Sequence, residues 1–267
     1  MKKIQKKNFT IVGVITSDNY DDIVTSSISP DIQEQLLSCD VFEFRADTFP
    51  EKEITALLKN LRFSLNNSQN NEYNLLFTLR LKRDGGQWHK ESELRYPIMT
   101  DIVTSKLANW IDIEMEEIKK TPVFLLNKMK KCLIKLLLSH HNFKNTYSKP
   151  EFLKITQQMA KFVPDIVKFA VTANSKEELE ILLQFSTELI QDFPESCLMS
   201  MGEYGKLSRI SSPIIGSPIT FGYIGDSAVI PGQIKVSKLK EKLKKCQEEE
   251  ILKMDNLIPI FEQILNE

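Results

Sequence analysis

Short apolar runs rich in β-branched residues recur along the chain, starting roughly every 22 to 36 residues. Each run has the length of a strand, and several are almost continuously apolar, which is typical of strands covered on both faces. The pattern therefore predicts eight strands, at 9–16, 40–45, 74–80, 110–115, 133–139, 165–171, 196–201 and 218–222.

Segments with helical periodicity lie between the predicted strands, and one such segment closes the chain. Apolar residues three or four positions apart lie on one face of a helix. The clearest sets are Ile32, Leu36 and Leu37; Ile54, Leu57, Leu58 and Leu61; Leu179, Ile181, Leu182 and Phe185; and Leu257, Ile260, Phe261 and Ile264.

Eight strands that alternate with helices over about 250 residues are typical of the closed (β/α)8 barrel, or TIM barrel. A doubly wound open sheet alternates in the same way. Its dinucleotide-binding form needs a glycine-rich turn after the first strand, but residues 11–15 contain only Gly13. Because no Pro-, Gly- or Ser-rich linker interrupts the 267 residues, we predict an α/β fold with one (β/α)8 domain over 1–267.

Composition narrows the functional classes. The net charge of −1 provides no excess of positive charge for a phosphate backbone, so we expect no nucleic-acid partner. No apolar run reaches the ~18 residues that a membrane helix needs. The basic and then apolar N-terminus lacks the cleavage site of a secretory signal, and the four cysteines form no CxxC pair. We therefore predict a cytoplasmic protein that does not contact membranes.

Polar or soft side chains fall at the ends of six of the eight predicted strands. In a (β/α)8 barrel the catalytic groups collect at the carboxyl ends of the strands. The residues within these strands, at their ends or just beyond them are Glu43, Arg45, Arg80, His140, His141, Lys168, Met199, Met201, Arg209 and Gln233. Alternation along the second strand places Glu43 and Arg45 on one face.

Lys168 lies inside an apolar strand, between Val167 and Phe169. Burial there disfavours the charged ammonium, and a neutral amine can attack a carbonyl and form a Schiff base. A lysine at a strand end can equally reach water or pair with an acid, and the pattern alone does not decide between these interpretations.

The adjacent histidines and the three strand-end arginines suggest partners for such a lysine. A histidine near a Schiff base typically transfers protons, although a turn histidine without a catalytic role is more common, and adjacency leaves open which of His140 and His141 acts. Arg45, Arg80 and Arg209 would converge on a carboxylate substrate, whereas a single arginine more often forms a surface salt bridge.

Two further features concern a loop and a carboxylate cluster. Six of the nine glycines lie between positions 202 and 232, so residues 223–233 are predicted to form a mobile lid. Glu114, Glu116 and Glu117 resemble a metal-binding cluster, but we expect Glu116 and Glu117 to lie in solvent. Because no histidine is spaced to join them, no metal site is predicted.

Several motifs carry a family resemblance, beginning with FEFRAD (42–47) and FTLRLKRDGG (77–86). They are similar to the motifs E-x-R-x-D and F-T-x-R-x-x-x-E-G-G of type I 3-dehydroquinate dehydratase, and the resemblance extends over essentially the whole chain. SHHNF (139–143), DIVKFAV (165–171), MSMGEYGKLSR (199–209), GSPITFG (216–222) and PGQI (231–234) resemble the later motifs.

The resemblance implies a cytosolic (β/α)8 lyase of the shikimate pathway that acts on 3-dehydroquinate, usually as a homodimer, without metal or cofactor. Lys168 would form the imine, His141 would be the general acid and base, and Asp84 would stand at the position of the histidine's partner. Arg209 would hold the substrate carboxylate. The remaining binding residues would be Glu43, Arg45, Arg80 and Gln233 for hydroxyls and ring, and Met199, Met201 and Phe221 for an apolar wall.

The chain departs from the family pattern at several positions. Asp84 stands where the family has Glu, and Asn142 replaces the usual Asp beside the histidine. The loop 227–233 is two residues longer than usual, which leaves Ser227 or Val229 as the lid residue. Thr16 or Ser17 is the candidate from the first strand. The alternatives are another Schiff-base lyase of the aldolase type, or a degenerate homologue that binds without catalysis.

Overall fold

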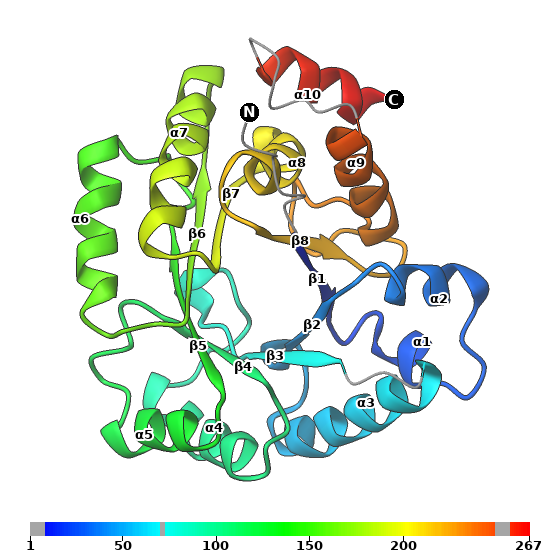
Figure 1. Cartoon of the computed structure of the whole chain (residues 1–267). Coiled ribbons are helices and arrows are strands. Elements are labelled where there is room, and N and C mark those ends of the chain that lie inside the picture. The colour runs from blue at the N-terminus through cyan, green and yellow to red at the C-terminus, as the bar shows by residue number, and fades with distance from the viewer. Residues whose placement is uncertain (1–8, 70–72, 249–256) are drawn as a thin grey trace.

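The computed structural model describes residues 9–69, 73–248 and 257–267 and contains an eight-stranded, all-parallel sheet. The strands are β1 (Thr10–Ile15), β2 (Val41–Arg45), β3 (Asn74–Thr78), β4 (Trp110–Glu114), β5 (Lys135–His141), β6 (Ile166–Thr172), β7 (Ser196–Met201) and β8 (Ile219–Tyr223). Their order is β7-β6-β5-β4-β3-β2-β1-β8, so only the junction between β7 and β8 lacks a ladder within the described strands. The predicted (β/α)8 barrel is confirmed, and it is nearly closed (Figure 1).

Helices follow the strands and surround them on the outside (Figure 1). They are α1 (Tyr20–Val24), α2 (Pro30–Leu36), α3 (Ile54–Gln69), α4 (Arg95–Thr104), α5 (Val123–Lys131), α6 (Lys149–Ala160), α7 (Lys176–Asp192), α8 (Gly205–Ile215), α9 (Val236–Glu248) and α10 (Leu257–Asn266). Short 3-10 turns at Ala46–Thr48, Glu51–Glu53, Lys82–Asp84, Ser92–Leu94 and Gly202–Tyr204 lie in the loops after strands β2, β3 and β7. These loops meet at one end of the barrel, where the site described below lies.

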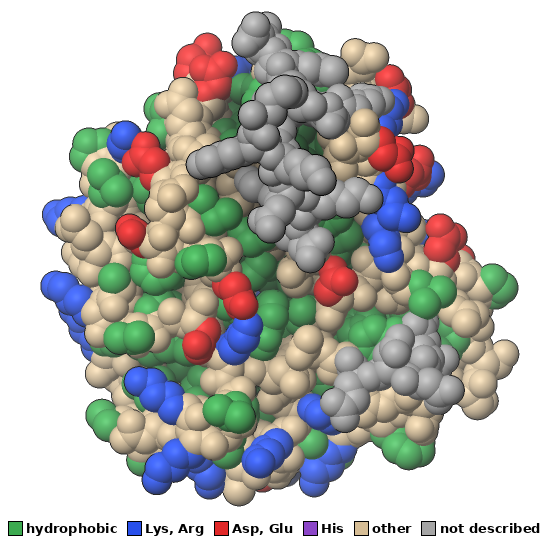
Figure 2. All heavy atoms as spheres, in the orientation of Figure 1, with side chains coloured by type: hydrophobic (Ala, Val, Ile, Leu, Met, Phe, Trp, Pro, Cys, Tyr) green, Lys and Arg blue, Asp and Glu red, His purple; other side chains and the backbone are tan. Residues whose placement is uncertain are grey.

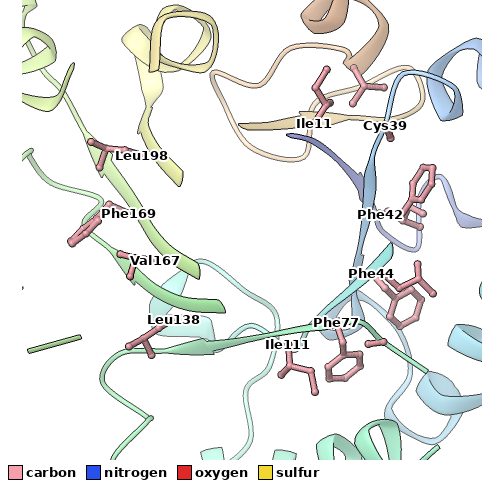
Figure 3. Close-up of a cluster of buried hydrophobic side chains, with 14 of the residues drawn as sticks. Ile11, Cys39, Phe42, Phe44, Phe77, Ile111, Leu138, Val167, Phe169 and Leu198 are labelled. Carbon is pink, nitrogen blue, oxygen red and sulfur yellow. The ribbon is translucent and has the colours of Figure 1, made fainter. Parts of the chain in front are cut away.

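The apolar residues form two layers because successive side chains of a strand point to opposite faces. Outward-facing residues such as Phe42, Phe77 and Phe169 point away from the barrel interior and pack under the helices (Figure 3). Inward-facing residues, which include Val12 and Leu137, fill the barrel interior. This double coverage explains the nearly continuous apolar runs in the sequence.

Two apolar residues do not take the places that the pattern predicts. Leu133 was expected to begin the fifth strand, but it ends the turn after α5 with φ 57° and is 90% exposed. The strand therefore begins at Lys135 and extends to His141. Leu37 lies just beyond the end of α2, where its side chain is exposed rather than packed. A periodicity argument does not detect that a helix ends one residue early.

None of the described helices is long and apolar enough to cross a membrane. On the face shown in Figure 2, basic and acidic side chains are interspersed, with hydrophobic side chains between them. This mixture is expected of a chain with a net charge of −1.

Candidate active site

The structure brings the eleven residues with predicted catalytic or binding roles to one pocket at the carboxyl end of the barrel. The pocket is lined by Lys168, His141, Asp84, Glu43, Arg45, Arg80, Met199, Met201, Arg209, Phe221 and Gln233, together with Gly85, Phe143, Ala170 and Ile230. Parallel pairing brings them together, since the carboxyl ends of all eight strands face the same side.

Lys168 projects from β6 into the pocket and is 6% exposed. Its Nζ lies 3.6 Å from Asp112 Oδ2 and 4.0 Å from Glu43 Oε1. The same nitrogen lies 4.1 Å from the centroid of the Phe221 ring. The amine therefore lies between two carboxylates and an aromatic face, beside the space that a ligand would occupy.

Asp112 is a buried residue of β4 beside Lys168 that sequence reasoning missed. It accepts a hydrogen bond from Ser139 Oγ at 2.6 Å and another from the Arg80 guanidinium. Burial alone would raise the pKa of Asp112, but the positive charges of Arg80 and Lys168 hold it below its usual value. An acidic residue inside the apolar segment WIDIE was the available signal.

His141 lies at the end of β5 and lines the pocket. Burial, followed by the positive charges of Arg80 and Lys168, lowers the pKa of His141 well below 6.5. Its ring is therefore neutral at pH 7 and can accept a proton. Phe143, which sequence reasoning did not assign to the site, stacks on this ring with centroids 6.2 Å apart and an interplanar angle of 12°.

The separation of Asp84 from His141 is longer than a hydrogen bond. Asp84 Oδ1 and His141 Nδ1 are 3.9 Å apart, and this Nδ1 is buried without a hydrogen-bond partner in the described part of the chain. A side chain one methylene longer than aspartate would reach further toward the ring.

The neighbouring His140 has a different environment and does not line the pocket. Its Nδ1 lies 2.8 Å from Glu116 Oε1, and its Nε2 lies 2.9 Å from the Tyr147 hydroxyl. Adjacent residues of a strand face opposite sides, so only His141 can meet a ligand near Lys168.

Of the three arginines predicted for the site, Arg45 and Arg80 are neutralised by carboxylates. Arg45 forms a two-point pair with Asp47 at 3.0 and 2.9 Å, and Arg80 pairs with Asp112 and Glu114. Arg80 lies two residues beyond β3 rather than inside it.

Arg209 has no carboxylate partner among the residues that the structure describes. It donates to the backbone carbonyls of Ser200, Phe221 and Gly232 at 2.9, 3.1 and 2.9 Å. Burial lowers the pKa of Arg209 to about 10. A buried guanidinium held by neutral carbonyls is the arrangement that a carboxylate ligand would complete.

The predicted lid, residues 223–233, reaches the pocket through Ile230 and Gln233. The Gln233 side-chain oxygen accepts hydrogen bonds from the amides of Val229 and Ile230 at 2.9 and 3.2 Å. Neither Ser227 nor Val229 lines the pocket in this structure, whereas Ile230 does, so which loop residue faces a substrate stays a prediction.

The first-strand candidates are likewise outside the pocket lining. Thr16 is buried, with its amide bonded to Asn19 Oδ1 at 2.8 Å. Ser17 is exposed, with its amide bonded to Thr48 Oγ1 at 3.0 Å. Both residues belong to the turn that connects β1 to α1.

Of the three glutamates at the end of β4 and in the turn after it, Glu116 is exposed as predicted, but Glu117 is buried rather than in solvent. Glu117 is fully buried and pairs with Arg83, while Glu114 pairs with Arg95 at 2.8 Å. Within the described residues, no group of three or more His, Cys, Asp or Glu side chains is arranged to hold a metal ion. The arginines that neutralise Glu114 and Glu117 come from distant positions that local spacing cannot reveal.

Comparison with known proteins shows a consistent relationship. Residues 25–250 match the family described as type I 3-dehydroquinase. The chain is 29% identical to 3-dehydroquinate dehydratase from Clostridium novyi over 89% of this chain and 97% of that protein. It is 32% identical to the enzyme of the same name from Methanococcus maripaludis, over 79% of this chain and 90% of the relative.

Solved structures agree with the sequence matches. The type I 3-dehydroquinate dehydratase of Clostridium difficile, solved with covalently modified comenic acid, superposes with a TM-score of 0.77 at 25% identity and covers 91% of this chain and 93% of its own. The 3-dehydroquinate dehydratase of Enterococcus faecalis superposes with a TM-score of 0.73 at 26% identity, covering 91% and 96%.

Proposed function

Because this chain belongs to the type I 3-dehydroquinase family, a family of hydro-lyases, we propose that it dehydrates 3-dehydroquinate to 3-dehydroshikimate through an imine on Lys168. The reaction is a step of the shikimate pathway of aromatic amino acid biosynthesis. The observation that carries the proposal is the pocket that holds the Lys168 amine, the neutral His141 ring and the Arg209 guanidinium together.

Imine formation uses the Lys168 amine as a nucleophile. Its nitrogen attacks the substrate ketone, a C–N bond forms, and the carbonyl oxygen leaves as water. Asp112 and Glu43, at 3.6 and 4.0 Å, are close enough to stabilise the positive iminium. The iminium withdraws electrons from the neighbouring carbon and acidifies its C2 proton.

His141 carries the proton between the two halves of the reaction. The neutral ring removes the C2 proton, and the electron pair moves to the iminium nitrogen to give an enamine. The imidazolium then protonates the β-hydroxyl, which leaves as water while the enamine returns to a conjugated iminium. Hydrolysis of that iminium releases 3-dehydroshikimate and regenerates Lys168, so the balance is the loss of one water molecule.

The other pocket residues divide into polar and apolar groups. Arg209 binds the substrate carboxylate, because it is the buried guanidinium without a carboxylate in the described structure. Glu43, Arg45, Arg80 and Gln233 face the hydroxyls and the imine-bound ring, and Met199, Met201 and Phe221 form the apolar wall. No metal or cofactor takes part in this scheme.

Borohydride trapping tests the imine directly. The protein is mixed with 3-dehydroquinate, reduced with borohydride and digested, and the modified peptide is located by mass spectrometry. We expect a reduced adduct on Lys168, and none in a Lys168→Met variant.

The trapping experiment also separates the two competing functions. A folded protein that gives no adduct but is thermally stabilised by 3-dehydroquinate would be a degenerate binding homologue. The 3.9 Å separation of Asp84 from His141 is the observation that favours this second candidate. Turnover of keto-acid aldol substrates, with an adduct only on those, would indicate an aldolase.

The expectations of a homodimer, a cytoplasmic location and one domain over 1–267 are part of the same proposal. Support for the dimer comes from the family resemblance. The lack of a membrane-crossing helix among the described residues is compatible with the cytoplasm.

A further inference from the structure

Asp84 faces the catalytic histidine with one carboxylate oxygen and an arginine with the other. Its Oδ1 lies 3.9 Å from His141 Nδ1, and its Oδ2 accepts a hydrogen bond from Arg83 Nε at 3.3 Å. The orientation of this one carboxylate therefore decides whether the buried His141 Nδ1 has a partner within reach.

Arg83 connects Asp84 to a buried anchor. Its Nη2 donates to Oε1 of Glu117, which is fully buried. The Glu117 backbone is fixed in the turn after β4, since its amide donates to Glu114 O at 2.9 Å and its carbonyl accepts from the Thr121 amide at 3.0 Å. The glutamate is thus a rigid point outside the substrate pocket.

The turn that carries Asp84 is short, and its own hydrogen bonds hold the backbone rather than the side chain, since the Asp84 amide donates to Leu81 O at 3.0 Å. It is a single 3-10 turn, Lys82–Asp84, and it ends at Gly85 in the left-handed region with φ 79°. A 3-10 turn of this length has poor hydrogen-bond geometry, and glycine adds conformational freedom. Among the described residues, the Asp84 carboxylate accepts one side-chain hydrogen bond, and Arg83 donates it.

We propose that Arg83 is a positioning residue that holds the Asp84 carboxylate beside His141 by bridging it to Glu117. This inference rests on the proposed function, because its kinetic consequence requires His141 to transfer the proton. Arg83 itself does not line the pocket and touches no reacting atom.

Electrostatics gives the bridge a second effect. The charged groups that face Asp84 are Glu114 and Glu116 from β4 and its following turn, Arg80 from the loop after β3, Arg83 from its own turn, and His141 from β5. Burial, with Glu114 and Glu116, raises the pKa of Asp84, whereas Arg80 and Arg83 lower it. Loss of Arg83 would raise the pKa of Asp84 further, and a protonated carboxyl no longer attracts the imidazolium.

The test compares Arg83→Ala with Lys82→Ala. Lys82 is an exposed cation on the same turn that makes no ion pair in the described structure. We expect Arg83→Ala to lower kcat roughly 10-fold with little change in KM, the magnitude typical of losing a residue that orients a catalytic group. The acid limb of its kcat profile, which reports the coupled Asp84–His141 pair, should move to higher pH. Arg83→Lys should recover part of both changes, and Lys82→Ala should match the wild type.

A double variant shows whether Arg83 acts through Asp84. In an Asp84→Asn background, Arg83→Ala should cause no further loss, because the carboxylate that it positions is gone. The proposal is overturned if Arg83→Ala matches Lys82→Ala in kcat and pH profile while the wild type is active, or if its loss adds fully to that of Asp84→Asn.

Failure of the proposed function gives a different result. A wild type that does not turn over 3-dehydroquinate would contradict the function, and the positioning claim is then measured without substrate. Carbon-13 NMR titration of the Asp84 carboxyl, assigned with Asp84→Asn, should show a higher pKa in Arg83→Ala. An unchanged titration would reject the bridge.

Discussion

Two buried polar groups in the site are only partly satisfied by the described residues: one lacks a counter-charge and the other lacks a hydrogen bond. Arg209 has backbone carbonyls but no carboxylate in the described residues, and His141 Nδ1 has no hydrogen bond there. Buried polar groups are usually hydrogen-bonded, because an unpaired group loses its solvation without compensation. Their coincidence in one pocket with Lys168 marks the place where a ligand would supply the missing contacts.

The lowered pKa of His141 predicts two pH effects. Because the folded protein resists protonation of this ring, activity should persist below pH 6.5 and fall only as the pH approaches the lower folded-state value. The unfolded chain takes up the proton from about pH 6.5 downward, so the free energy of unfolding should decrease over the same interval. The measurements are a kcat/KM profile and chemical unfolding between pH 7 and pH 4.

The adjacent histidines provide a matched pair for this prediction. His141→Asn should reduce kcat by about 10²- to 10⁴-fold, the usual contribution of a general acid or base, and should remove the histidine part of the stability loss. His140→Asn, outside the pocket lining, should retain the wild-type profile. Equal losses in both variants would contradict the assignment of proton transfer to His141.

At the scale of elements, three successive helix-to-strand connections use a left-handed residue that is not glycine. Lys106, Leu133 and Val163 follow α4, α5 and α6 with φ of 50°, 57° and 49°. At Leu133 the helix ends with hydrogen bonds from the amides of residues 133 and 134 to Lys130 O and Met129 O at 3.1 and 3.0 Å. Glycine is the preferred residue at this position because it has no Cβ to clash with the backbone.

Leu133→Gly should therefore stabilise the protein. The left-handed conformation costs an L-residue ~1–2 kcal/mol, and the side chain, 90% exposed, contributes little packing. After the entropy cost of glycine we expect a gain of about 0.5–1 kcal/mol in the free energy of unfolding, measured by urea denaturation. Leu153→Gly is the control, because Leu153 is also exposed but lies inside α6, where glycine should destabilise the helix.

At the scale of the whole molecule, the barrel predicts one cooperative unfolding transition. Its strands form one continuous sheet from β7 to β8, and the outward-facing core extends under α1 to α10 without a division. Calorimetry should show a single peak for residues 1–267. If the proposed homodimer forms, its midpoint should rise with protein concentration. Two separated peaks would contradict the single domain.

The local sequence pattern was enough to place the strands and the polar residues in them and at their carboxyl ends. A strand buried on both faces is apolar almost throughout, so a polar residue inside it, such as Lys168, or at its end, such as His141, stands out in the sequence. Strand boundaries were less predictable, since Leu133 is as apolar as a core residue although a helix ends there. Asp112 was not predicted as a site residue, because the sequence does not show that this carboxylate inside a strand lies beside Arg80 and Lys168.

The sequence by itself determined the (β/α)8 architecture and most of the polar residues that line the pocket, because both follow from the period of the side chains and the position of each strand end, whereas Asp84 and Phe221 came from the family resemblance. Only the tertiary structure decided which arginine remains unpaired, which histidine faces the lysine, and that Glu117 is a buried anchor rather than a surface charge. These properties depend on distances between residues far apart in the chain. A local sequence pattern does not contain such distances. The energy of a buried charge depends on them, because they determine whether the charge is paired.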